Sequence, residues 1–359
     1  MLTTFTISNN KRKLQYNNNY NSNKKLKLSK LNTHSHSPSQ TITPPRTPTT
    51  SHQIFNQPEL LNIILSNLDS NSLFNCLKVS KLWYHSTIPF IETQNLTFKS
   101  FKQLETFNNN NLTKLVNYSP KSLMLQNIHQ SSIIPQNISL KNLIHLSYHN
   151  CSKILPPIDW FVSENLQSLK SLTISNNQLL DDNYLLSISP FLKNLKYLDL
   201  RACYNISDIG ITSIATNCPN LIFINLNRKK HFIATKKNHI ISSISLMAIA
   251  NYTNIKILGI SGSSICDAGM FQLIKNRGKH LITLSINDCT LLTNHSLKIF
   301  SNNFKLLPIL TRLEICRIEK NFGNFNLKSL QNWRLKNHLN LLQIKFTNHH
   351  HLKSHHHFL

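Results

Sequence analysis

The sequence predicts an α/β fold in which short parallel strands and helices alternate in a stack of repeats. The main observation is the phrase Leu-x-x-Leu-x-Leu with apolar variants, which begins at Leu143, Leu169, Leu195 and Leu221, at intervals of 26 residues. It then returns at intervals of 34, 26 and 29 residues, ending with the unit at Leu310. Alternating apolar residues of this kind predict a half-buried strand. With less regular units at Leu96, Leu123 and Leu341, we count ten repeats in all.

The second observation is a helix-like segment after the strand of each of four repeats. Asp182, Asp208, Asp267 and Asn294 stand at or near expected helix N-caps. Apolar residues follow each of them at helical spacing: Leu185 and Ile188; Ile211, Ile214 and Ala215; Met270, Leu273 and Ile274; Leu297 and Phe300. A period in the twenties that carries this phrase resembles the leucine-rich repeat. The resemblance implies a right-handed solenoid, or horseshoe, over residues 93–346.

The third observation is the position of the cysteines within the repeats. Cys151, Cys203 and Cys289 each lie three residues after the last strand leucine or its equivalent, and Asn177 occupies that place in a sister repeat. Cys218 takes a position that other repeats give to leucine. We therefore predict structural cysteines, and the odd total of seven without a CxxC pair predicts neither a disulfide frame nor a zinc site.

Composition excludes several function classes. No secretory signal or membrane span is expected, because Met1–Asn10 lacks an apolar core and no long apolar run follows. With six glycines and no GxGxxG or GxxxxGK, a nucleotide site is not expected, and we predict no cofactor. The net charge of +25 favours anionic partners, which include acidic protein surfaces, nucleic acid and import carriers. We rank nucleic acid last because no aromatic-basic motif accompanies the charge.

Residues 1–53 are predicted to be a disordered tail, rich in Asn, Ser, Thr and basic residues and free of acidic ones. Two basic clusters in it resemble a bipartite nuclear import signal, which implies a protein of both nucleus and cytoplasm: Lys11 and Arg12; Lys24, Lys25 and Lys27. The alternative is a tail that only aids solubility. Ser37, Thr43 and Thr47 each precede proline and are candidate sites for a proline-directed kinase.

Residues 54–92 predict a separate unit of two or three short helices. Pro58 suits a first helical turn, and Asp69–Ser72 supplies a turn and a cap. This segment resembles an F-box at the following positions: Pro58-Glu59-Leu60-Leu61, Ile64-Leu65, Leu68, Leu77-x-Val79-Ser80-Lys81 and Trp83. The resemblance implies binding to the Skp adaptor of a Skp–cullin–F-box ubiquitin ligase through these residues: Pro58, Leu60, Leu61, Ile64, Leu65, Leu68, Val79 and Trp83. The alternative is a plain helical cap on the repeats.

The repeat from Leu195 to Leu221, with Cys203 and the Cys218-Pro219-Asn220 segment, resembles the cysteine-containing class of leucine-rich repeat. That class commonly follows an F-box, and residues 54–346 resemble fungal F-box proteins that antagonise the mitotic exit network. The resemblance implies a non-catalytic substrate receptor of the ligase that restrains mitotic exit and governs daughter cell separation. Its implied partners are a small Ras-like GTPase and a daughter-specific transcription factor. The alternative is a scaffold that blocks the GTPase by occupancy, without ubiquitination.

Two groups of residues are candidates for binding the client. The first lies between the strand leucines on the expected concave surface: Lys196, Tyr197, Asp199 and Arg201. The second lies in the 34-residue repeat, whose extra residues predict a loop: Lys229, Lys230, Phe232, Lys236 and Lys237. The His-rich end at 347–359 is predicted to be an incidental polar tail, with transition-metal binding as the alternative.

Overall fold

The computed structural model describes residues 57–110, 116–130, 137–162, 166–229, 240–302, 304–315, 335 and 343–345. All of them belong to one compact unit, which extends from Thr50 to Leu359. The predicted basic tail with its import clusters and phosphorylation sites, and the His-rich end, lie outside the described residues.

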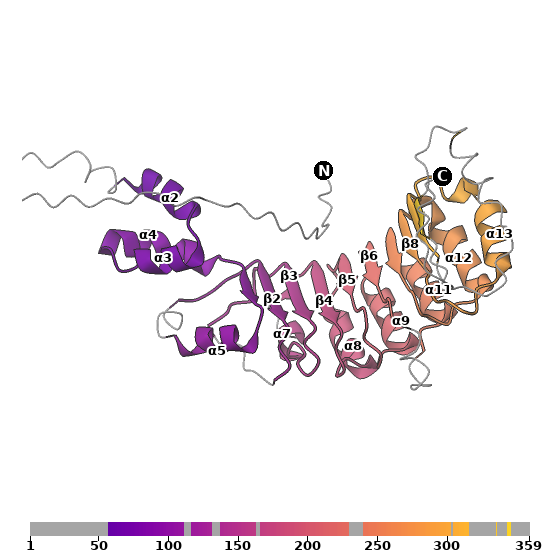
Figure 1. Ribbon diagram of the computed structural model, residues 1–359, viewed down its shortest axis with the longest axis horizontal. Coiled ribbons are helices and arrows are strands. Elements are labelled where there is room, and N and C mark those ends of the chain that lie inside the picture. Colours follow the sequence, from indigo (N-terminus) through magenta and orange to yellow (C-terminus); the bar gives the residue numbers. More distant parts are fainter. Residues whose placement is uncertain are drawn as a thin grey trace, which may run out of the picture. The chain divides into compact units, whose positions relative to one another are not determined.

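The described residues form a ten-stranded parallel sheet in which every strand pairs with its neighbours in chain order. Figure 1 shows the central strands side by side in one row. The strands are β1 (Leu96–Phe98), β2 (Ser122–Gln126), β3 (His145–His149), β4 (Ser171–Ser175), β5 (Tyr197–Asp199), β6 (Phe223–Asn225), β7 (Ile257–Gly259), β8 (Thr283–Ser285), β9 (Arg312–Glu314) and β10 (Gln343–Lys345). The predicted α/β stack of ten units is confirmed, including the three less regular ones.

Helices return the chain along one side of this row, as Figure 1 shows for α7 to α12. They are α5 (Phe101–Asn109), α7 (Asp159–Val162), α8 (Asp182–Ile188), α9 (Asp208–Asn217), α11 (Ser243–Tyr252), α12 (Asp267–Arg277) and α13 (Asn294–Asn302), with 3-10 turns η2 (Ser189–Phe191), η3 (Gly278–His280) and η4 (Phe304–Leu306). None of the helices in the described part of the chain has the length and apolarity needed to cross a membrane.

The strand leucines form a continuous ladder in the core. Leu146 pairs with Leu172, Leu172 with Leu198, and Leu198 with Ile224, so that equivalent positions of successive repeats stand directly side by side. All four side chains are at most 1% exposed. Because each strand buries this face only against its neighbours and the helices behind, stacking itself creates the core.

A bend follows most strands at the same repeat position. The residue two places after the last strand leucine or its equivalent has a positive φ in six repeats, which is the left-handed region that Gly and Asn tolerate best: Asn127, Asn150, Asn176, Ala202, Gly262 and Asp288. The Asn150 amide donates to Asn127 and the Asn176 amide to Asn150, at 2.7 and 2.6 Å. Each asparagine therefore forms the bend of its own repeat, and the Asn150 and Asn176 amides connect their bends to the bend of the preceding repeat.

The cysteines lie one residue beyond this bend and point into the core. Cys203 is fully buried, and its thiol lies 3.1 Å from the carbonyl oxygen of Ile174 in the preceding repeat. Cys289 makes the same contact with Ile260 at 3.4 Å. Asn177 fills the place in its own repeat, where its amide donates to Cys151 and Ile154 while its oxygen accepts two backbone N–H groups. The predicted structural role is confirmed for Cys203 and Cys289.

The helix aspartates connect one repeat to the next. As predicted, Asp182 and Asp208 stand near the helix N-caps: they are the first helical residues, and Asp181 and Ser207 are the caps. The Asp182 carboxylate instead accepts from the backbone N–H groups of Ser207 and Gly210, at 2.8 and 3.0 Å. It thereby satisfies N–H groups at the start of the following helix, which lack partners within that helix.

The same arrangement recurs along the stack. Asp208 accepts from the backbone N–H groups of Ser242 and Ser245 in the next repeat, at 2.8 and 3.1 Å, and from both hydroxyl groups. Asp267 accepts from the backbone and hydroxyl of Thr293 and from the Ser296 hydroxyl. Although burial raises the pKa of Asp267, these hydrogen bonds outweigh that effect, and its pKa is below the usual 3.8.

We predict that Asp208→Ala lowers the free energy of unfolding by about 1–3 kcal/mol, because the Ser242 and Ser245 N–H groups at the start of α11 lose their acceptor. Urea unfolding followed by circular dichroism measures this change. Glu105→Gln on the exposed surface of α5 is the matched control, for which we expect a change below about 0.5 kcal/mol. Equal stability of Asp208→Ala and the control would contradict this role.

Candidate protein-docking surfaces

The first candidate surface is on the helical unit made of α2 (Pro58–Ser66), α3 (Ser70–Cys76) and α4 (Lys81–Glu92). Pro58 opens α2, and the side chains of Asp69 and Ser80 cap α3 and α4 by accepting from Ser72 and Trp83 backbone N–H groups. Both α2 and α3 pack against α4. The predicted short helices are present, and they belong to the same compact unit as the repeats.

The predicted adaptor-binding residues fall into three groups by exposure. Leu61 and Leu65 are at most 1% exposed, because their side chains belong to the core of the unit. Ile64, Leu68 and Trp83 are half-buried, and the latter two pack against that core. Pro58, Leu60 and Val79 remain accessible, with Val79 61% exposed.

The exposed apolar side chains of this unit include three that sequence reasoning missed. Ile63 is 61% exposed, and Leu82 and Tyr84 are also exposed. Leu60 and Ile63 are three residues apart and therefore share one side of α2. That spacing was visible in the sequence, but α2 is apolar on both its inner and outer sides, so spacing alone did not show which side faces solvent.

The second candidate surface is the open side of the sheet, where strand side chains that do not enter the core emerge. Lys196, Tyr197 and Arg201 are exposed there, as predicted. Asp199, the fourth predicted residue, is 8% exposed and already paired within the chain. Its carboxylate lies 2.7 Å from the Arg201 guanidinium and also accepts the Arg201 backbone N–H. Asp199 therefore orients Arg201.

An aromatic pair lies on this open side. The rings of Tyr197 and Phe223, from adjacent strands, are 6.3 Å apart, and Phe223 is half-buried. Phe223 was not among the predicted residues, although it takes the same repeat position as Tyr197. Lys229, at the start of the predicted loop, is exposed, whereas Lys230, Phe232, Lys236 and Lys237 lie outside the described residues.

The described residues hold no group of three His, Cys, Asp or Glu side chains that could bind a metal ion. Burial raises the pKa of the Cys203, Cys218 and Cys289 thiols to about 12, which keeps them protonated. Cys266 differs, because hydrogen bonding with Ser243 and the first N–H groups of α12 lowers its pKa. It is also half-buried rather than buried.

Comparison with known proteins relates the short helices to a domain family and most of the chain to fungal proteins. The F-box domain family matches residues 58–87, which cover α2, α3 and the first part of α4. The chain is 35% identical over 267 residues to antagonist of mitotic exit network protein 1 of Saccharomyces cerevisiae, covering 71% of this chain and 46% of that protein. It is 35% identical over 300 residues to the Candida glabrata protein of the same name, covering 75% and 56%. The chain thus spans about half the length of these curated relatives.

Among solved structures, the chain is similar to one from the Rad7 and Elc1 complex in yeast. The match has 11% sequence identity and a TM-score of 0.34, and it covers 76% of this chain and 92% of that one.

We predict that iodoacetamide at pH 8 alkylates Cys266 at least about tenfold faster than Cys203, because the thiolate is the reactive form and only Cys266 has a lowered pKa and access to solvent. Mass spectrometry of tryptic peptides over a time course measures both rates. Urea-unfolded protein is the control, in which the two rates should converge. Equal rates in the folded protein would contradict the assignment of Cys203 to the core.

Proposed function

We propose that this chain, an F-box domain protein homologous to the fungal antagonists of the mitotic exit network, is the substrate-recognition subunit of a Skp–cullin–F-box ubiquitin ligase. In this role it restrains mitotic exit by binding a client through its repeats. The observation that carries the proposal is the exposed apolar side of α2 within the segment that matches the F-box family.

Exposed apolar side chains of this size favour a protein partner. Leu60 and Ile63 are 37% and 61% exposed on a helix whose opposite side, with Leu61 and Leu65, is already packed. A unit that served only as a helical cap would have no need of a second apolar side. The Skp adaptor is the partner that an F-box implies.

The proposed contribution to catalysis is proximity. A receptor that holds a client beside a ubiquitin-charged enzyme raises the effective concentration of the reacting groups, and the bond-making residues belong to other subunits. The proposed clients are a small Ras-like GTPase of the mitotic exit network and a daughter-specific transcription factor. The basic clusters of the tail support a protein that works in both nucleus and cytoplasm.

We predict that the double variant Leu60→Asp/Ile63→Asp loses co-purification with the Skp adaptor, because two carboxylates would be buried without partners at the contact. Pull-down of tagged adaptor followed by immunoblotting measures this. The control is Ile209→Asp/Ile244→Asp, which places two carboxylates at exposed apolar positions of the repeat helices. We expect that control to retain adaptor binding. Undiminished recovery with Leu60→Asp/Ile63→Asp would remove the ligase proposal.

A second measurement separates degradation from occupancy. If the chain acts through a ligase, a cullin inhibitor should lengthen the half-life of its client in a cycloheximide chase, and the Leu60→Asp/Ile63→Asp variant should do the same. A client whose half-life responds to neither would favour the scaffold that acts by occupancy alone.

A further inference from the structure

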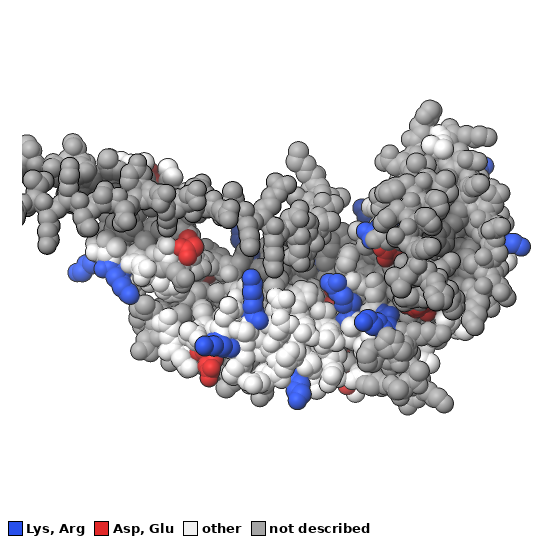
Figure 2. All heavy atoms as spheres, in the orientation of Figure 1, with Lys and Arg blue, Asp and Glu red and all other residues white. Residues whose placement is uncertain are grey.

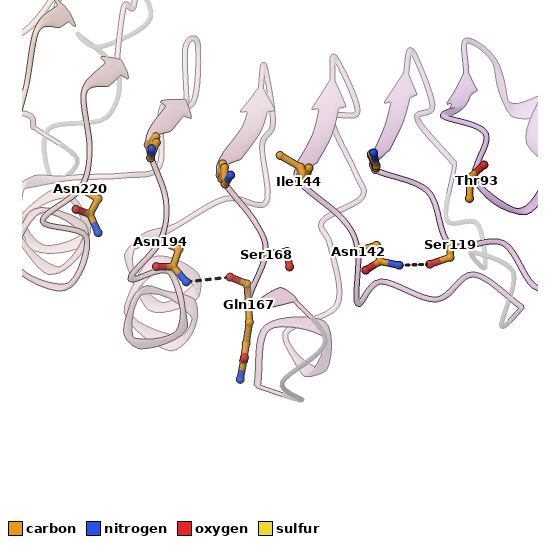
Figure 3. A pocket seen from close by; sticks show the side chains of 11 residues that line it. Thr93, Ser119, Asn142, Ile144, Gln167, Ser168, Asn194 and Asn220 are labelled. Atoms are coloured by element: carbon orange, nitrogen blue, oxygen red, sulfur yellow. Dashed lines mark hydrogen bonds between the residues drawn. The ribbon is translucent and has the colours of Figure 1, made fainter.

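A groove of about 550 Å³ runs along the edge of the sheet where the strands begin. Its lining comes from the loops that lead into six consecutive strands, from Thr93 before β1 to Asn220 before β6. Figure 3 shows the labelled Asn142, Asn194 and Asn220 in a row across these loops. The groove is separate from the F-box helices α2 and α3 and from the core.

The charge of the groove is uniformly positive. Lys121, Lys170 and Lys196 line it, and no acidic residue is among its lining residues. Each of these lysines immediately precedes its strand, so all three take the same repeat position. The ion pairs found in the described residues are Arg201 with Asp199 and Arg312 with Glu314, and neither involves these lysines. Their ammonium groups are therefore available to a ligand.

The walls of the groove are fixed by hydrogen bonds between repeats. The Asn142 amide donates to the Ser119 hydroxyl, the Asn194 amide to the Gln167 carbonyl and the Asn220 amide to the Lys193 carbonyl, at 2.9 to 3.0 Å. The backbone beneath the lysines is fixed too, since the Lys170 carbonyl accepts the N–H groups of both Lys196 and Tyr197. The groove is thus formed before any partner arrives, which reduces the entropy lost on binding.

We infer that this groove binds an extended, acidic segment of a partner protein. Strands about 4.8 Å apart give six loops a span of about 24 Å, which an extended chain crosses in about seven residues. Carboxylates on such a segment would face the three lysines, while the polar Asn, Ser and Gln side chains offer partners for its backbone. The inference deepens the proposed function, because it names the chemical class of client segment that the repeats hold.

Two other occupants fit less well. The basic tail of this chain has no acidic residue before Glu59, so its charge opposes the groove. Single-stranded nucleic acid is usually held by aromatic stacking and arginine, and the lining includes neither. In Figure 2, Lys and Arg side chains are scattered over the visible described surface and form no continuous patch there.

Fluorescence anisotropy with a labelled ten-residue peptide of alternating Glu and Ser tests this inference on the full chain. The variant Lys121→Gln/Lys170→Gln/Lys196→Gln should weaken binding about tenfold or more, since three charge pairs are lost. The matched control Lys99→Gln/Lys153→Gln/Lys279→Gln removes three exposed charges elsewhere and should change affinity less than about twofold. The Lys→Glu triple at the groove positions should instead bind a peptide of alternating Lys and Ser.

The result expected is binding of the acidic peptide, none of its Gln-Ser counterpart, and a loss specific to the groove triple. Equal loss in both triples would overturn the inference, because net charge alone would then explain binding. So would failure to bind the acidic peptide, or tighter groove-dependent binding of a ten-nucleotide thymidine strand. The Leu60→Asp/Ile63→Asp variant should bind the peptide normally, and the groove triple should still bind the Skp adaptor, so failure of one proposal is distinguishable from failure of the other.

Discussion

The buried ladder of strand leucines is the interaction on which the rest of the described structure depends. One repeat presents three apolar strand residues and a short helix, too little to exclude water alone, so each repeat gains its core from its neighbours. Truncation of a single member such as Leu198 to alanine should cost about 2–5 kcal/mol, in the range of other fully buried leucines. Stability is thus spread along the stack, with helix residues such as Leu185 and Ile211 packed behind the ladder.

Polar side chains stabilise the backbone at two places in the repeats, the end of the strand and the start of the helix. At the strand ends, the left-handed bend and its Asn and Cys residues satisfy backbone groups, as the two amide contacts between Asn127, Asn150 and Asn176 show. At the helix starts, Asp182, Asp208 and Asp267 cap the helix of the next repeat. Among the described acidic side chains of these repeats, five are used in this way or in pairs with arginine: Asp182, Asp199, Asp208, Asp267 and Glu314. Lys121, Lys170 and Lys196 take part in neither of the described ion pairs, and the groove that they line is therefore positively charged.

Much of the fold could be predicted from the sequence, because the 26-residue period fixes both the strand register and the position of the cysteines. Burial was harder to predict where it depends on a neighbour. Asp199 looks like a surface residue in its own strand, but Arg201 folds back onto it. Leu61 and Leu65 match an F-box as well as Leu60 does, yet only packing against α4 shows which of them faces inward. The sequence shows that the groove lysines share one repeat position. It does not show that the six loops lie side by side and form a groove.

Hydrogen exchange of the full chain, with and without the Skp adaptor, tests most directly the claim that the F-box helices bind the ligase while the repeats remain open to a client. The account predicts that the adaptor slows exchange in peptides covering α2 to α4 and leaves peptides covering β3 to β8 unchanged. Slowed exchange across the strands, with none in α2, would contradict it.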